Sequence, residues 1–288
     1  MKDSLLIKFL YGTVIGRTML KILVAPRVSE LAARFLTSRY SVWLIPSFIR
    51  KNKIEMSRYV IPPGGYRSFN DFFTRKLKEE YRVRNGGMLI CPCDGLLTVA
   101  KIDDDLTFSI KHTEYSIREL LGNEALAAEY DGGTAYVFRL TPAHYHRYVF
   151  CTTGVLLGRK RIRGILHSVQ PICHEKTKVF VQNTREYVVI KNQILGKVVQ
   201  MEIGALLVGK ISNQKRKKQE FVRGGQEKGY FEYGGSSIVV LTKKDAELPE
   251  NLLHRDAIGT ELPVMAGETL INFIGGGVEA WELERQRK

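Results

Sequence analysis

Long hydrophobic runs are missing from this 288-residue chain, which has no stretch of about 18 consecutive apolar residues. Its apolar N-terminal segment is interrupted by Lys8, Arg17, Lys21 and Arg27. That interruption argues against both a membrane-spanning helix and a cleaved signal sequence. We therefore expect a protein of the cytoplasm, or one attached to the cytoplasmic side of a membrane.

Cysteine is scarce, and its spacing argues against a zinc knuckle. The four cysteines are Cys91, Cys93, Cys151 and Cys173, and no two of them have CxxC spacing. They are expected to be reduced, buried thiols, and no metal site is expected. The nucleotide motifs GxGxxG and GxxxxGK[ST] and the hydrolase elbow GxSxG are absent too. An enzyme with this sequence would therefore make its own cofactor or need none.

Positive charge is abundant. The chain has 44 Lys and Arg against 30 Asp and Glu, a formal net charge of +14. Such an excess favours an anionic partner, either a membrane surface or nucleic acid. Two dense basic runs, RKRIR at 159–163 and KRKK at 215–218, fall in predicted turns. Most such runs are simply solvated, so these two do not identify the partner.

The pattern predicts an α+β fold in two parts, divided near residue 60. Residues 3–55 carry apolar side chains at helical spacing among basic ones, which fits either a helical cap or a segment lying in a bilayer interface. A further short helix is expected in RSFNDFFTRKLK, 67–78. From residue 88 onward, short strands, HYHRYVF at 144–150 among them, alternate with turns. This alternation favours a largely antiparallel sandwich or barrel-like domain over 61–288.

Three separate motifs supply groups that can carry chemistry. Asp94 lies in the turn PCDG, His144 and His146 lie in HYHR, and Ser236 follows two glycines in YGGSS. Each has an ordinary structural explanation when taken alone. Together they provide a carboxylate, a base and a nucleophile.

The order of the motifs gives the three groups a common context. The chain contains SFNDFFTRKL, CPCDG, TPAHYHRY, GILHSVQPI, VFVQNTRE, IGALLVGKI and EKGYFEYGGSSIVVL, in that order. This series resembles that of the pyruvoyl-dependent phosphatidylserine decarboxylases over roughly residues 10–245. Residues 1–60 then favour a helical membrane-associating region, and 61–288 a catalytic domain.

The resemblance implies a self-cleaving enzyme. Ser236 would attack the carbonyl of Gly235, cutting the chain into residues 1–235 and 236–288 and leaving a covalent pyruvoyl group derived from Ser236. That group would form a Schiff base with phosphatidylserine, which loses CO2 to give phosphatidylethanolamine. Asp94, His146 and Ser236 are the implied catalytic residues, and His146 is the candidate to reprotonate the product carbon. Arg75 and His144 are auxiliary or substrate-binding candidates.

Departures from the family pattern leave the self-cleavage base open. Many members have DYHR followed by HxP, whereas here His144 replaces the Asp, Val149 replaces the second His, and Cys151 replaces the Pro. Either His146 or His144 could serve beside Asp94. A lipid-binding relative that no longer processes itself is one alternative, and a basic nucleic-acid-binding protein is another, although no nucleic-acid motif is present.

The expected partners follow from the same resemblance. They are phosphatidylserine, an anionic membrane surface and the two cleavage chains, with no nucleic acid, and a homo-oligomer is left open. We expect a peripheral protein on the cytoplasmic face of the cell membrane, held there by the amphipathic N-terminal region.

Overall fold

The computed structural model describes most of the chain: residues 9, 13, 16, 19, 26–84, 87–110, 113–165, 167–168, 178–205, 210–234, 236–244 and 261–271. Apart from four isolated positions, the helix expected before residue 26 lies outside these residues.

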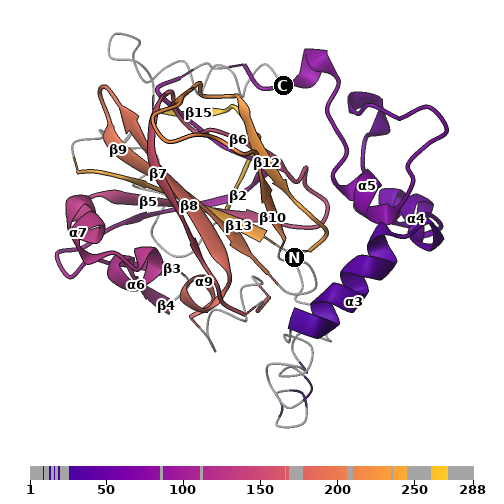
Figure 1. The fold of residues 1–288 in the computed structure, drawn as a ribbon, viewed down its shortest axis with the longest axis horizontal. Coiled ribbons are helices and arrows are strands. Elements are labelled where there is room, and N and C mark those ends of the chain that lie inside the picture. The colour runs from indigo at the N-terminus through magenta and orange to yellow at the C-terminus, as the bar shows by residue number, and fades with distance from the viewer. Residues whose placement is uncertain are drawn as a thin grey trace.

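An antiparallel sheet of eight strands forms the body of the described structure (Figure 1). In spatial order it contains β11 (Phe221–Val222), β7 (Gly154–Ile162), β8 (Arg185–Asn192), β9 (Gly196–Gly204), β13 (Ser236–Thr242), β5 (Thr134–Leu140), β2 (Gly95–Lys101) and β14 (Leu262–Val264). Every neighbouring pair in this order runs antiparallel.

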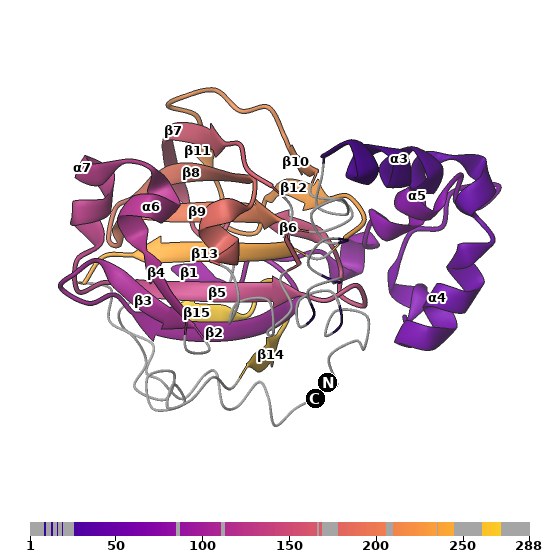
Figure 2. The ribbon, with the colours of Figure 1, turned by 90° about the horizontal axis from the view of Figure 1, so that it is seen from below.

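Strand β13 is central and buried on both faces, which explains its uninterrupted apolar run (Figure 2). Ile238 and Val240 join one core cluster, and Val239 and Leu241 join another. Because side chains alternate along a strand, Ser236 lies on the face of Ile238 and Ser237 on the opposite face. The two serines of the motif therefore project into different cores.

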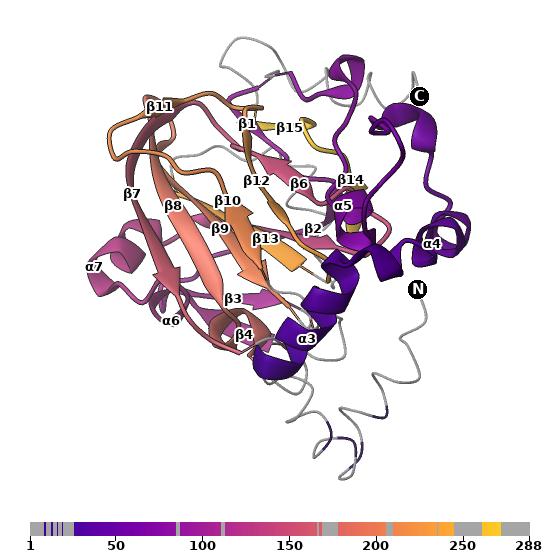
Figure 3. The same cartoon turned by 45° about the vertical axis from the view of Figure 1, so that its right-hand side comes forward.

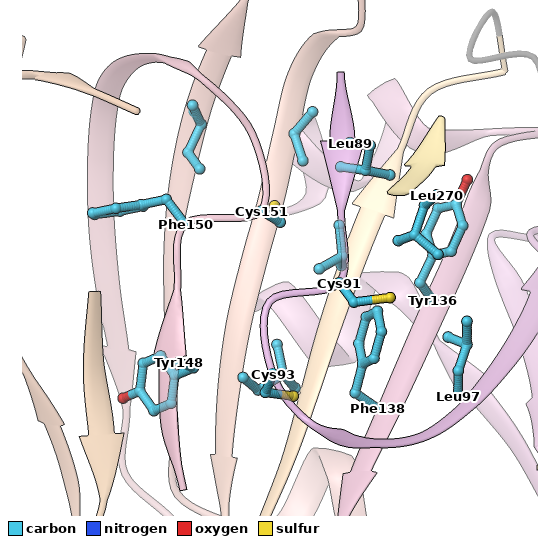
Figure 4. Packing of buried hydrophobic residues seen from close by; sticks show 14 of the residues in the cluster. Leu89, Cys91, Cys93, Leu97, Tyr136, Phe138, Tyr148, Phe150, Cys151 and Leu270 are labelled. Atoms are coloured by element: carbon cyan, nitrogen blue, oxygen red, sulfur yellow. The ribbon is translucent and has the colours of Figure 1, made fainter. Parts of the chain in front are cut away.

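Smaller pairings cover the two faces of the main sheet. On the face of Ile238 lie a three-stranded sheet and the pair of β1 with β15, and the other core includes the hairpin of β3 with β4. The bounds are β10 (Ile211–Asn213), β12 (Glu227–Phe231), β6 (Arg147–Val149), β1 (Leu89–Ile90), β15 (Thr269–Ile271), β3 (Thr107–Ile110) and β4 (Thr113–Ser116). Cys91, Cys93 and Cys151 are buried among apolar side chains (Figure 4). The prediction that the cysteines are buried is confirmed for these three.

Some helices form a layer beside the sheet, and others cover the core that contains Val239 and Leu241 (Figures 1 and 3). Their bounds are α3 (Pro26–Thr37), α4 (Leu44–Asn52), α5 (Phe69–Phe73), α6 (Ile117–Leu121), α7 (Glu124–Ala127) and α9 (Val179–Gln182), with 3-10 turns at Arg39–Ser41, Met56–Arg58, Glu79–Tyr81 and Ala128–Tyr130. Helices α3, α4 and α5 share one apolar cluster built around Phe69, Phe72 and Phe73. Within the described residues, no helix combines the length and apolarity needed to cross a bilayer.

The predicted α+β class is confirmed, with one local difference that concerns the histidines. The sequence predicts HYHRYVF as a strand, but β6 begins only at Arg147. His144 and His146 instead lie in the connection that follows β5. The reason is local: the side chain of His144 accepts a hydrogen bond from the main chain of Thr141, which closes a turn in place of a sheet ladder.

Candidate active site

Strand ends bring the three sequence motifs to one edge of the main sheet. Ser236, the first residue of β13, pairs with Leu140 at the end of β5 and with Gly204 at the end of β9. Asp94 directly precedes β2, which pairs with β5. Asp94, the two histidines that follow β5, and Ser236 therefore gather at the same end of the sheet.

The connection after β5 fixes the tautomers of both histidines. The main-chain N–H of Thr141 donates to Nδ1 of His144 at 3.0 Å, so a neutral His144 carries its proton on Nε2. In His146, by contrast, Nδ1 is the donor: it lies 2.9 Å from the carbonyl oxygen of His144, which can only accept. The lone pair of a neutral His146 is therefore on Nε2, whereas the lone pair of His144 is already engaged.

His146 is fully buried, and its Nε2 makes no hydrogen bond within the described part of the chain. Its ring packs on that of Phe73, with 4.0 Å between the centroids. Burial lowers the pKa of His146 to about 3; the carbonyls of His144 and Gly234 oppose this shift, while the charge of Arg75 adds to it. The ring is thus a neutral acceptor beside the segment that precedes Ser236.

Asp94 lies near His144, close enough for the two side chains to interact electrostatically. Its Oδ1 accepts a hydrogen bond from the main-chain N–H of Ala266 at 2.9 Å. Burial raises the pKa of Asp94, opposed by this hydrogen bond and by the positive charges of His144, Arg58 and Arg75. Burial also lowers the pKa of His144, opposed chiefly by Asp94. The structure therefore couples Asp94 electrostatically to His144.

Ser236 is fully buried, and its hydroxyl has no hydrogen-bond partner among the described residues. Gly235, the predicted cleavage partner, lies outside those residues. The residue before it, Gly234, has a φ of +144°, a backbone conformation that is essentially restricted to glycine. The glycine at 234 is thus explained by the backbone bend that leads to Ser236.

Helix α5 holds the segment before Ser236 in place. The side-chain oxygen of Asn70 accepts a hydrogen bond from the main-chain N–H of Tyr233 at 3.1 Å. Phe69 and Phe73 both meet the Tyr233 ring edge-on, with 5.0 Å between centroids. The sequence interpretation expected a short helix here but assigned no role to Asn70 or Tyr233. The SFNDFF motif was the signal that marked this helix.

Arg75 lies just after α5 and is a buried cation that forms no ion pair with a carboxylate in the part of the chain that the structure describes. It is 2% exposed, and its guanidinium carbon lies 4.2 Å from the centre of the Tyr59 ring and 5.0 Å from that of Phe72. Nη1 donates a long hydrogen bond, 3.5 Å, to the carbonyl of Phe72. Nε and Nη2 have no partner within the described residues. Arg75 therefore has donors free for an anion that the described residues do not supply.

Arg147 ties the helical layer to the sheet, a role that the sequence interpretation missed. Its Nε donates to the carbonyl of Thr74 at 2.8 Å, and its Nη1 pairs with Glu227 at 2.8 Å. Since Thr74 caps α5 and Arg147 begins β6, this contact fixes α5 against the histidine connection.

The family model and the similar proteins described next all carry the same family name. The family model for phosphatidylserine decarboxylase matches residues 69–272. A Clostridium acetobutylicum protein named phosphatidylserine decarboxylase proenzyme 2 is 44% identical over 268 residues, 92% of this chain and 90% of that one. Phosphatidylserine decarboxylase proenzymes of Ruminiclostridium cellulolyticum (37% over 275 residues; 93% and 91%) and Clostridium botulinum (34% over 266 residues; 90% of each) are also similar. The chain belongs to the phosphatidylserine decarboxylase family.

Proposed function

We propose that this chain is a self-processing phosphatidylserine decarboxylase that cuts itself between Gly235 and Ser236. The observation that carries the proposal is a pair of buried groups at one end of the sheet that have no hydrogen-bond partner among the described residues: the Ser236 hydroxyl and Nε2 of His146. A buried polar atom without a partner is costly, and such atoms are typical of sites that perform chemistry.

The cleavage uses the Ser236 hydroxyl as nucleophile. Its oxygen bonds to the carbonyl carbon of Gly235, its proton passes through a base to the nitrogen of residue 236, and the C–N bond between the two residues breaks to leave an ester and a free amine. Loss of the α-proton of residue 236 then expels the Gly235 carboxylate. Hydrolysis releases ammonia and leaves a pyruvoyl group at the start of chain 236–288, separate from chain 1–235.

The surroundings of Ser236 fit such a group. Its side chain has no hydrogen bond to a described residue, and pairing of β13 with β5 and β9 holds the new chain start in the sheet. When formed, the pyruvoyl carbonyl supplies the electrophile for the amine of phosphatidylserine and the sink for the electrons left by CO2. The buried position of residue 236 favours a step in which the charge of a carboxylate disperses as CO2 forms.

His146 is the proposed proton carrier in both reactions. Its neutral Nε2 can take the proton of Ser236 during cleavage, because burial keeps the ring unprotonated. In turnover, the same nitrogen is proposed to return a proton to the product carbon. Asp94 is proposed to orient His144. Its carboxylate interacts electrostatically with that ring and opposes the lowering of the His144 pKa by burial.

Self-cleavage should be insensitive to pH in the range where an ordinary histidine titrates. Because the pKa of His146 is about 3 rather than the usual 6.5, its ring stays neutral, and able to accept a proton, as the pH falls through 6.5. We expect the cleavage rate of freshly synthesised chain to show no inflection between about pH 5 and 8 and to fall only below about pH 4. Time courses of cell-free product on gels measure this. A halving of the rate near pH 6.5 would contradict the role given to His146.

Arg75 is the proposed anchor for an anionic group of phosphatidylserine. Methionine in its place would fill the space against Tyr59 and Phe72 without a buried charge, so Arg75→Met should fold normally. We expect its KM for phosphatidylserine to rise about 10- to 100-fold with a much smaller change in kcat, since a charged hydrogen bond to substrate is lost. Kinetics in detergent micelles measure both constants.

An exposed arginine outside residues 1–60 supplies the control for that experiment. Arg223 is exposed and lies between β11 and β12. Arg223→Met should leave both constants unchanged, and Arg75→Lys, which keeps the charge, should recover part of the lost affinity. An unchanged KM in Arg75→Met would show that Arg75 only braces the fold.

Residues 1–60, which include α3 and α4, are the proposed membrane-associating region. Its described surface exposes large apolar side chains, among them Leu31, Phe35, Tyr40 and Trp43. Such side chains beside basic residues suit the headgroup boundary of an anionic bilayer. The proposed location is the cytoplasmic face of the cell membrane, where the lipid substrate lies.

Intact mass of the purified protein tests the proposed function directly. Two chains with a junction between Gly235 and Ser236, the second starting with a carbonyl-reactive group, are expected. A single stable chain of 288 residues would indicate instead a relative that does not process itself.

A further inference from the structure

The two basic runs singled out in the sequence meet at one cavity. Arg159 of the first run lies in β7, and Arg216, Lys217 and Lys218 of the second lie between β10 and β11. This connection runs beside β7 (Figure 2), with the main-chain N–H of Gln219 donating to the carbonyl of Leu156 at 2.7 Å. All four cationic side chains line a cavity of about 510 Å³.

The wall of this cavity has an apolar part, and its inner polar side chains already have hydrogen-bond or ion-pair partners. Phe150, Leu156 and Val188 contribute the apolar surface. Lys228, 2% exposed, is paired with the buried carboxylate of Glu202. The second carboxylate, Glu186, accepts a hydrogen bond from Asn213 at 2.9 Å. The carboxylates of Glu202 and Glu186 are buried and interact with Lys228 and Asn213. They form no ion pair with the described cations at the rim.

The rim carries positive charge that is only partly paired by the residues that the structure describes. Arg216 is paired with Glu220 at 2.7 Å. Arg159, Lys217 and Lys218 are exposed, and their side chains form no ion pair with any described residue. Three unpaired cations around a concave surface with an apolar wall are suited to an anion that also carries a non-polar part. A phosphate ester meets both conditions, since Arg and Lys are the usual ligands of phosphate oxygens.

We propose that this cavity is a second ligand site, which binds a phosphate ester with its phosphate at the rim of Arg159, Lys217 and Lys218 and its organic part against the apolar wall. None of Asp94, His144, His146, Ser236 and Arg75 lines the cavity, so the site is separate from the catalytic end of the sheet. The same phosphate chemistry occurs in a lipid headgroup and in a soluble metabolite. The experiment below distinguishes these two sources.

The test compares two triple variants that remove equal charge from the same two runs. Arg159→Ala/Lys217→Ala/Lys218→Ala takes away the rim cations. Arg161→Ala/Arg163→Ala/Lys215→Ala takes away three exposed cations that do not line the cavity. All six side chains are exposed, so both proteins are expected to fold, which thermal unfolding verifies.

Binding is measured on the purified full-length protein with two probes. Calorimetry uses sn-glycerol 3-phosphate, and flotation uses phosphatidylglycerol–phosphatidylcholine vesicles against pure phosphatidylcholine vesicles. The rim variant should lose at least about tenfold in affinity for the probe that wild type binds, and the control variant less than about twofold. Rim-dependent binding of glycerol phosphate assigns a soluble ligand, and rim-dependent binding of the vesicles alone assigns a lipid headgroup. Equal losses in the two variants, or no binding of either probe by wild type, would overturn the proposal.

Discussion

Replacing Ser236 with alanine is expected to leave the chain uncut at 288 residues and to abolish release of CO2 from phosphatidylserine. The substitution removes the oxygen that attacks Gly235 and, with it, the only precursor of the pyruvoyl group in the proposed mechanism. Both losses should be complete, because alanine has no hydroxyl and the hydroxyl of the adjacent Ser237 projects from the opposite face of β13. Intact mass and release of CO2 from carboxyl-labelled substrate measure the two outcomes.

Structural damage would not explain such a result. The Ser236 hydroxyl is buried and makes no hydrogen bond within the described residues, so its removal breaks no contact. Deleting an unsatisfied buried oxygen is neutral or slightly stabilising. Thermal unfolding of Ser236→Ala should therefore match that of an uncleaved wild-type chain.

Ser237 provides a closely matched control. It is also fully buried, its hydroxyl also lacks a partner among the described residues, and it is adjacent in the same strand. It projects from the opposite face of β13, away from the Ser236 side chain. Ser237→Ala should cleave and turn over normally. Residual CO2 release by Ser236→Ala, or loss of cleavage in Ser237→Ala, would contradict the assignment of the nucleophile.

The local pattern of apolar and polar residues was sufficient to predict the fold class and the positions of many strands along the chain. Short alternating or apolar runs separated by turns predicted a largely antiparallel sheet, and Ser236–Thr242 is indeed a strand. The same reasoning failed for His144 and His146. A hydrogen bond between a side chain and the main chain, from Thr141 to His144, decided that segment, and residue spacing carries no signal for it.

Contacts between distant residues were beyond prediction from single motifs. Asn70 meets Tyr233 across 163 positions, and Arg147 meets Thr74 across 73. The ordered motif series identified which segments belong to the site but not what each one touches. Likewise, both basic runs were visible in the sequence, but only the pairing of β11 with β7 places them at one cavity.

The identity of the cleavage base can be resolved with one substitution made at two positions. Asparagine places an amide where Nδ1 of histidine lies and removes Nε2. In His146→Asn, the donor to the carbonyl of His144 is kept and the Nε2 lone pair is lost. In His144→Asn, the acceptor for the N–H of Thr141 is kept. The two variants thus preserve the local turn and differ in which Nε2 is missing.

We expect His146→Asn to slow self-cleavage about 10²- to 10⁴-fold, the usual contribution of a general base, and His144→Asn to stay within about tenfold of wild type. The reason is the tautomer that each ring is held in: only His146 has an unbonded lone pair in the described structure, because the Nδ1 lone pair of His144 is committed to Thr141. Time courses of cell-free product give both rates. The opposite ranking would make His144, coupled to Asp94, the base, and would leave His146 with reprotonation of the product alone.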